Sequence, residues 1–263
     1  MRDEARRFGS PRRPLTLATQ RCYTLPMGGA EANLASVTPR VPEGWALEDD
    51  FHMPDNRDQD RGSELVVSCL ARRPDLGWVA RNMALRWSEE HPQVGVDTDV
   101  MLLPSEPPGA EHLKSVRTWI PGHLPPRVAL EFVSEGTASK DYGVGVEKYD
   151  ASGTRELWVF DPFKLGPSHS GGPFVLQVYR RSRKRKGRKE RFERVYAGDG
   201  PAPTEELGAW LVVTDGGCRL RLAEDPEGVA LWPTGEEAER AGRVRAEAEL
   251  ERLRAELERL RQG

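Results

Sequence analysis

The stretch VALEFVSEG, Val128–Gly136, places one carboxylate inside a run of strand-forming residues. Valine, leucine and phenylalanine favour strands, so the run predicts a strand with at least one buried face. A buried strand has no structural need for Glu131 in its middle, because an unpaired buried charge is costly. Glu131 is therefore either a metal ligand or a glutamate on the wet face of a half-exposed strand.

The segments beside this strand show regular patterns. Upstream, VDTDVMLLP is a short apolar strand that Asp99 opens. Downstream, TASKDYGVGVEKYDASGT predicts a helix that begins at Thr137 or Ser139 and ends at Gly153. RELWVFDP then predicts a strand that stops at Pro162.

Further elements are expected on both sides of this region. RGSELVVSCLARRPD (Arg61–Asp75) has helical apolar spacing, and GWVARNMALRW predicts a strand or a strand pair. The proline- and glycine-rich stretch from Ser105 to Pro126 reads as a long loop. PFVLQVYRR with ERFERVYAG, and LGAWLVV with CRLRLAED, predict two hairpins, the second turned at Asp215–Gly217.

The composition limits the function classes. A formal net charge of −3 shows no overall basicity, so any contact with nucleic acid has to be local. The three cysteines are far apart and the five histidines form no HxH or HxxxH pair, which gives no zinc framework and no histidine metal site. With no signal-peptide core and no apolar run near 18 residues, we expect a cytoplasmic protein without a membrane partner.

Asp99 and Glu131 are candidate ligands for Mg²⁺, which prefers carboxylate oxygens, main-chain carbonyls and water. Two carboxylates on neighbouring strands lie about 5 Å apart and can share one ion. That ion would activate a water for attack on a phosphodiester. On spacing alone the alternative is favoured, in which Asp99 caps a strand and Glu131 faces solvent.

The residues around this pair resemble a known family. TDVMLLP, PPRVALEFVSEGTASKDY and KYDASGTRELWVFDP are similar to the strands and helix of the Uma2-like (DUF820) restriction endonuclease family, within the PD-(D/E)xK nuclease superfamily. The resemblance covers roughly residues 45–231 and is most specific between Asp99 and Pro162. It implies an α/β fold: a restriction-endonuclease-like mixed β-sheet core flanked by helices.

The resemblance also implies a site and a substrate. Asp99 and Glu131 would bind Mg²⁺, or Mn²⁺ in its place, and the carbonyl of Phe132 would be a third ligand. Trp158, Asp161 and Pro162 would serve packing and turn formation. DNA is the implied substrate, and a homodimer is a further expectation because nucleases of this superfamily often pair to cut both strands.

The expected lysine is missing from both family positions, which are occupied by Val133 and Gly145. Lys148 and Lys140 are the replacement candidates, since either long side chain could reach the site. The alternative for Lys148 is an exposed helix lysine. Glu64 on the first helix is a weaker metal-binding candidate, and a solvent-facing glutamate is its preferred interpretation.

The run from Arg180 to Arg191 holds nine Lys or Arg residues in twelve positions. It is either a phosphate-binding loop or a solvated loop without a partner. The DNA-binding candidates within it are Arg183, Lys184, Arg185, Lys186, Arg188 and Lys189.

Three parts of the chain are expected. Residues 1–44 form a disordered or loosely attached leader, residues 45–234 the endonuclease-like domain, and residues 235–263 a charged helix resembling a coiled coil. The helix carries Leu250, Leu253, Leu257 and Leu260 in a heptad seam of about two heptads, too short for strong self-association alone.

Two functions follow. The first is a metal-dependent DNA endonuclease that hydrolyses phosphodiester bonds. The second is a catalytically silent protein of the same fold that binds nucleic acid or a partner, an alternative kept open by Gly145.

Overall fold

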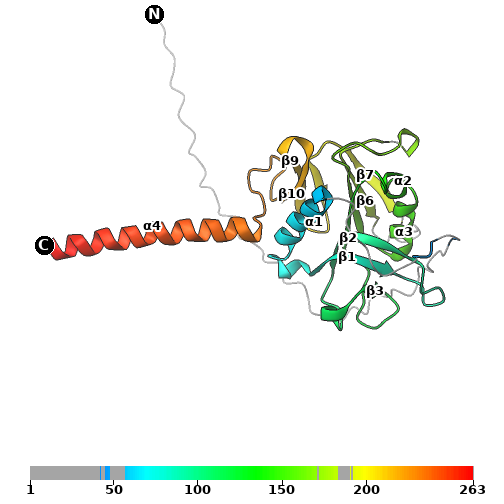
Figure 1. Cartoon of the computed structure of the whole chain (residues 1–263), viewed down its shortest axis with the longest axis horizontal. Coiled ribbons are helices and arrows are strands. Elements are labelled where there is room, and N and C mark those ends of the chain that lie inside the picture. The colour runs from blue at the N-terminus through cyan, green and yellow to red at the C-terminus, as the bar shows by residue number, and fades with distance from the viewer. Residues whose placement is uncertain are drawn as a thin grey trace, which may run out of the picture. The chain divides into compact units, whose positions relative to one another are not determined.

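A seven-stranded mixed sheet and a three-stranded sheet organise the computed structural model, which describes residues 42, 45–47, 57–170, 172–182, 190 and 192–262 (Figure 1). The strands are β1 (Trp78–Arg86), β2 (Gly95–Leu103), β3 (Ser115–Arg117), β4 (Val128–Phe132), β5 (Glu156–Phe160), β6 (Leu176–Arg181), β7 (Phe192–Gly198), β8 (Ala202–Thr204), β9 (Ala209–Thr214) and β10 (Arg219–Ala223). The larger sheet has the order β3-β1-β2-β4-β5-β6-β7, and the smaller one β10-β9-β8.

Four α-helices and four 3-10 turns complete the described elements. The helices are α1 (Arg57–Leu70), α2 (Ala138–Asp141), α3 (Val144–Ser152) and α4 (Gly235–Gln262). The turns are η2 (Pro74–Leu76), η3 (Ala110–His112), η4 (Ser168–Ser170) and η5 (Asp215–Gly217).

The centre of the large sheet is a strand–helix–strand unit. β4 and β5 are parallel and paired from Val128–Glu156 to Phe132–Phe160. Parallel neighbours need a crossover connection, and α2 with α3 provides it. β5 is buried along its whole length, so the end of β4 that carries Glu131 is held on a rigid support.

The two faces of the large sheet are covered differently. On one face α1 packs Val66, Cys69 and Leu70 into a core shared with Leu130 and with the three-stranded sheet. On the other face α2 and α3 bury Ala138, Tyr142 and Tyr149 against the strands. Figure 1 shows α1 beside β9 and β10, away from α2 and α3. The predicted α/β architecture, a mixed sheet flanked by helices, is confirmed.

The elements differ from the sequence-based expectations in three places. The expected single helix after β4 is two helices, because Gly143 takes a non-helical conformation (φ −129°, ψ −100°). The predicted long loop contains β3, which pairs in parallel with β1. The first helix runs from Arg57 to Leu70, so it begins before the expected Arg61 and ends before Asp75, and η2 follows at Pro74.

The two predicted hairpins are present as β6–β7 and β9–β10, with η5 at the predicted turn of the second. Among the residues that the structure describes, no helix combines the length and apolarity needed to cross a membrane. Apart from position 42, the predicted leader of residues 1–44 lies outside the described residues.

Candidate active site

Asp99 lies inside β2, where the pairing between β2 and β4 ends. The last paired residues are Val100 and Leu130, so one further step places Asp99 opposite Glu131. The main-chain NH of Phe132 donates instead to Oδ2 of Asp99, at 2.7 Å. Asp99 is 2% exposed. The expectation that it opens or caps a strand is wrong: its carboxylate replaces a main-chain acceptor in mid-sheet.

The neighbouring strand β1 has a break at the same level. Its pairing with β2 skips the position between Arg81 and Met83, where Asn82 has a positive φ of 50°. Residues four apart in a regular strand point to the same face of the sheet. Val96 and Val100 instead belong to cores on opposite faces, so the side chains of β2 change faces between them. This local irregularity brings Thr98 toward α3.

Glu131 is buried, with 6% of its surface exposed. The hydroxyl of Tyr149 on α3 donates a short hydrogen bond to Oε1 of Glu131 and is also hydrogen-bonded to Oγ1 of Thr98, at 2.9 Å. The alternative in which Glu131 faces solvent is therefore wrong. Tyr149 connects the carboxylate on β4 to the irregular part of β2.

The buried carboxylates interact unfavourably with one another. Burial raises the pKa of Glu131 well above its ordinary value, and the charges of Asp99 and Asp141 raise it further. Burial and the charge of Glu131 raise the pKa of Tyr149 well above its usual range. Tyr149 therefore stays protonated and remains a hydrogen-bond donor to Glu131.

Lys140, the last basic residue of α2, is the cation that balances this group. Burial alone lowers the pKa of Lys140, but four carboxylates outweigh it, and the net pKa is raised. These carboxylates belong to Glu131, Asp141, Asp97 and Asp99. A half-buried ammonium group that interacts with all four is correctly placed to stabilise negative charge at the site.

Lys148 has a different environment on α3. It is 7% exposed, so the alternative of an exposed helix lysine is wrong. Burial lowers the pKa of Lys148 and the charge of Lys140 lowers it further, while Asp97 opposes both. Its ammonium group lies 6.0 Å from the ring centroid of Trp45. Lys148 thus contributes less positive charge to the carboxylates than Lys140 does.

Gly145, where the family lysine was expected, lies at the junction of α2 and α3. A Cβ atom at this position would come within 2.9 Å of the main-chain oxygen of Lys140. Glycine therefore permits the close approach of the main chain at position 145 to the main chain of Lys140. The structure gives Gly145 a packing role.

Gly145→Ala should destabilise the protein although alanine is the better helix former by about 1 kcal/mol. The added methyl group has to displace the main chain of Lys140, and overpacking of this kind typically costs about 1–3 kcal/mol. Thermal unfolding of the variant measures the loss. Gly242→Ala on α4, where a Cβ would meet nothing within 4 Å, is the matched control and should not lower stability. A Gly145→Ala protein as stable as the control would contradict the packing role.

The donor set of the site fits a hard divalent cation. In the described part of the chain, no three or more His, Cys, Asp or Glu side chains form a metal-binding group. Zinc sites commonly use three or four protein ligands, whereas Mg²⁺ is bound through one or two carboxylates and keeps several waters. Asp99 and Glu131 are two facing carboxylates that repel each other, and this pair matches the ligand set of a Mg²⁺ site.

The other predicted residues are distributed around this site. Val133 is buried beside the strand end. Glu64 is exposed and lines a groove of about 810 Å³ that also includes Phe132 and Val133. Asp161 is buried and accepts hydrogen bonds from Tyr142, Leu165 and Gly166, which is a turn-forming and packing arrangement. The DNA-binding candidates from Arg183 to Lys189 lie outside the described residues.

Three contributors to the site were not selected from the sequence. Asp97 lies two residues before Asp99, and a buried oxygen of its carboxylate, Oδ1, has no hydrogen-bond partner within the described residues. Tyr149 and Asp141 lie within the predicted helix, where the sequence analysis assigned them no role. Two sequence features could have identified them. Asp97 and Asp99 are two residues apart on one strand, and Tyr149 lies four residues, about one helical turn, after Gly145.

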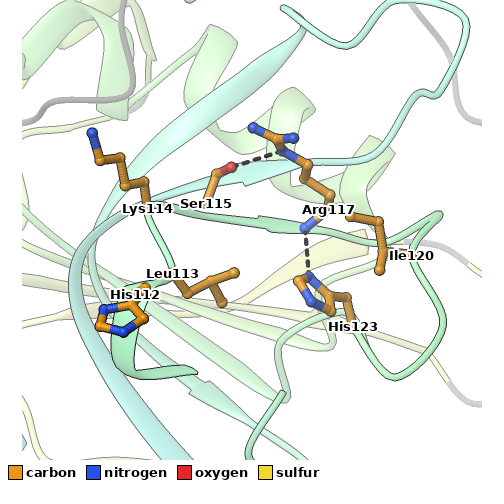
Figure 2. Close-up of a pocket in the computed structure, with 7 residues that line it drawn as sticks. All are labelled: His112, Leu113, Lys114, Ser115, Arg117, Ile120 and His123. Atoms are coloured by element: carbon orange, nitrogen blue, oxygen red, sulfur yellow. Dashed lines mark hydrogen bonds between the residues drawn. The ribbon is translucent and has the colours of Figure 1, made fainter. Parts of the chain in front are cut away.

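A second, basic feature lies at the edge of the same sheet. A cavity of about 280 Å³ is lined by His112, Leu113, Lys114, Ser115, Arg117, Ile120 and His123. Figure 2 shows its two internal hydrogen bonds, from Arg117 Nε to Ser115 Oγ (3.0 Å) and from the Arg117 main-chain NH to His123 Nδ1 (3.2 Å). Because Ser115 pairs with Ala84 and Ala84 with Asp97, the cavity lies two strand spacings, about 10 Å, from Asp97.

Comparison with known proteins gives one family match and one similar solved structure. A family model described as "Uma2: Putative restriction endonuclease" matches residues 51–192, more than half of the 263-residue chain. A solved structure of a "putative nuclease belonging to DUF820 from Anabaena variabilis ATCC 29413" is similar with 14% sequence identity, covering 59% of this chain and 75% of that chain, at a TM-score of 0.37. No curated protein matches the chain.

The family match extends from the segment before α1 to the start of β7 and includes every residue of the carboxylate group. Its nuclease description agrees with a mixed sheet in which Asp99 and Glu131 face each other at a break in the strand pairing. The chain belongs to the Uma2 family of putative restriction endonucleases.

Proposed function

We propose that the protein is a metal-dependent DNA endonuclease that hydrolyses phosphodiester bonds. The observation that supports this most is the pair Asp99 and Glu131, buried opposite each other with Lys140 interacting with both. A buried carboxylate such as Glu131, whose pKa is raised by burial and then by the charge of Asp99, has no stabilising value by itself, which favours a functional role.

The residues would act in the following way. Asp99 and Glu131 would hold Mg²⁺, with Mn²⁺ as a substitute, and the carbonyl of Phe132 would complete the protein ligands. When bound, the ion supplies an activated water and neutralises charge on the phosphodiester. Tyr149 fixes one oxygen of Glu131 through its hydrogen bond. Lys140 would orient the attacking water or stabilise the charge that develops on the phosphoryl group.

The alternative function is that of a catalytically silent protein of the same fold that binds nucleic acid or a partner. The absence of lysine from positions 133 and 145 favours it. Lys140 weakens this argument, because a lysine from the preceding helix interacts with the same carboxylates. Activity measurements separate the two functions.

The deciding experiment is a plasmid assay with the full-length protein. Supercoiled plasmid should be nicked in Mg²⁺ or Mn²⁺ but not in EDTA, and nicking should return when the cation is added back. The activity should elute together with the protein in size-exclusion chromatography, which excludes a contaminating nuclease. Absence of nicking in both cations, or nicking that persists in EDTA, would overturn the proposal.

The two candidate lysines are separated by matched variants. Lys140→Met should lower the rate of nicking by roughly 10²- to 10³-fold, since it removes the cation that interacts with the transition-state charge. Lys148→Met should lower the rate by less than about tenfold, because Lys148 interacts with Asp97 alone among the carboxylates. Rates at saturating Mg²⁺ and the melting temperature of both variants are the measurements. The reverse order of rates would assign the catalytic role to Lys148.

The cavity beside β3 is a second place for phosphate contact. Lys114 is exposed and has no ion pair within the described residues. Lys114→Ala should weaken DNA binding and reduce the slope of log K against log salt by about 1, as expected for one lost phosphate contact. Arg72→Ala is the control. Arg72 is also exposed and lies just after the C-terminal end of α1, so this variant should leave the slope unchanged. Equal slopes for the Lys114 variant and wild type would show that Lys114 does not contact phosphate.

A further inference from the structure

The C-terminal helix α4 carries a short apolar seam that contacts no other described part of the chain. Its first turn is attached to the domain, where the NH of Gly235 donates to Ser68 Oγ (2.9 Å) and Glu237 pairs with Arg221 (2.8 Å). From residue 243 to residue 262 every side chain is exposed. Within the described residues, four leucines on this part are 48–74% exposed: Leu250, Leu253, Leu257 and Leu260.

The spacing of these leucines defines a coiled-coil register. Steps of three, four and three residues place Leu250 and Leu257 at a positions and Leu253 and Leu260 at d positions. Ala246 occupies the preceding d position. A helix whose apolar stripe is narrow and exposed is typical of a coiled-coil strand and not of a helix that packs on its own domain.

The charges that flank the seam determine which partner fits. The g positions carry Glu249 and Glu256, and the e positions carry Arg254 and Arg261. In a parallel, in-register pair of identical helices, each g residue faces the e′ residue of the next heptad. This arrangement gives four Glu–Arg pairs between the two chains, Glu249 with Arg254 and Glu256 with Arg261 in both directions.

An antiparallel pair would place the same residues in unfavourable contact. There g faces g′ and e faces e′, so glutamates oppose glutamates and arginines oppose arginines. Within the described part of the helix only Glu249 of the four forms an ion pair, with Arg252 on the same helix at 2.7 Å. The other three charges are therefore available for contact with a second helix.

We propose that α4 is a homodimerisation element that binds α4 of a second copy of this chain in a parallel, in-register coiled coil. The Leu layers cover residues 250–260, with the charged pairs on both sides. Two leucine-bearing heptads make a short interface, so we expect reversible dimers with a Kd on the order of micromolar. The two-fold axis runs along the coil and brings two identical domains to the same end.

The test is the mass of the full-length protein in sedimentation equilibrium between about 1 and 200 µM. The wild type should change from monomer to dimer over this range. Leu253→Glu with Leu257→Glu should be monomeric throughout, while its domain melts at the wild-type temperature, because neither leucine contacts the domain. A wild type that is monomeric at 200 µM, or that forms trimers or tetramers, would overturn the proposal.

Charge exchange tests the parallel orientation. Glu249→Arg with Glu256→Arg should weaken the dimer at least tenfold at low salt, since arginine then faces arginine. Adding Arg254→Glu and Arg261→Glu to this variant reverses every pair and should restore wild-type dimerisation. Failure of the first change to weaken the dimer, or of the second to restore it, would exclude the parallel arrangement. Circular dichroism of each variant confirms that α4 remains helical.

Discussion

Asp99→Asn should reduce the rate of plasmid nicking by roughly 10³-fold or more, as expected when a ligand of the ion that activates water and binds the phosphoryl group is lost. Asparagine keeps an oxygen that can accept the hydrogen bond from the Phe132 main chain, so the end of the β2–β4 pairing should be preserved. The variant therefore removes the charge of Asp99 with little change of shape. Single-turnover nicking at saturating Mg²⁺ measures the effect.

Asp97→Asn is the matched control for this prediction. It makes the same chemical change two residues away on β2, and it also removes a carboxylate that interacts with Lys140. If charge next to Lys140 were all that mattered, both variants would lose activity equally. We expect Asp97→Asn to retain activity within about tenfold of wild type. Equal losses of nicking rate in both variants would show that Asp99 has no role beyond its charge. Full activity of Asp99→Asn would contradict the proposed metal site.

The sequence predicted the central strands and the two carboxylates because these depend on local pattern. β-branched and aromatic residues determine β4 and β5, and the resemblance selected Glu131 from among many glutamates. The position of Asp99 within β2 was less predictable. Its carboxylate accepts a hydrogen bond from the Phe132 main chain on another strand, which no local pattern in VDTDVMLLP reveals.

The lysine was the harder part of the site to predict. A single helix from Thr137 to Gly153 would place Lys140 more than a full turn away from position 145, and Lys148 appeared the nearer candidate. The break at Gly143 separates α2 from α3, and the absence of a side chain at Gly145 allows the two to approach. Such a close main-chain contact arises from tertiary packing. Helix propensity alone predicts only that these glycines destabilise a helix.

Glu131→Gln should make the metal-free protein more stable and also inactive. The pKa of Glu131 is raised in the folded protein by burial and then by Asp99 and Asp141, so its ionisation opposes folding. This penalty is absent below the ordinary glutamate pKa of about 4.3 and complete above the raised folded value. The stability advantage of Glu131→Gln should therefore grow as the pH rises between these limits and then remain constant.

Thermal unfolding of both proteins in EDTA across this pH range measures the advantage. An increase of several degrees is expected, because about 1 kcal/mol shifts the melting temperature of a domain of this size by about 2–4 °C. Gln is nearly isosteric with Glu and can still accept the hydrogen bond from Tyr149. A variant less stable than wild type at all pH values would show that the charged carboxylate itself supports the fold.

Mg²⁺ should reverse this order of stability. A cation held between Asp99 and Glu131 removes their repulsion and stabilises the folded wild type by about 2.7 kcal/mol at a concentration of 100 times its Kd. Glu131→Gln lacks one ligand and should gain much less from the same concentration. The two carboxylates therefore oppose folding without the ion and favour it when the ion is bound. Equal stabilisation of both proteins by Mg²⁺ would place cation binding elsewhere on the chain.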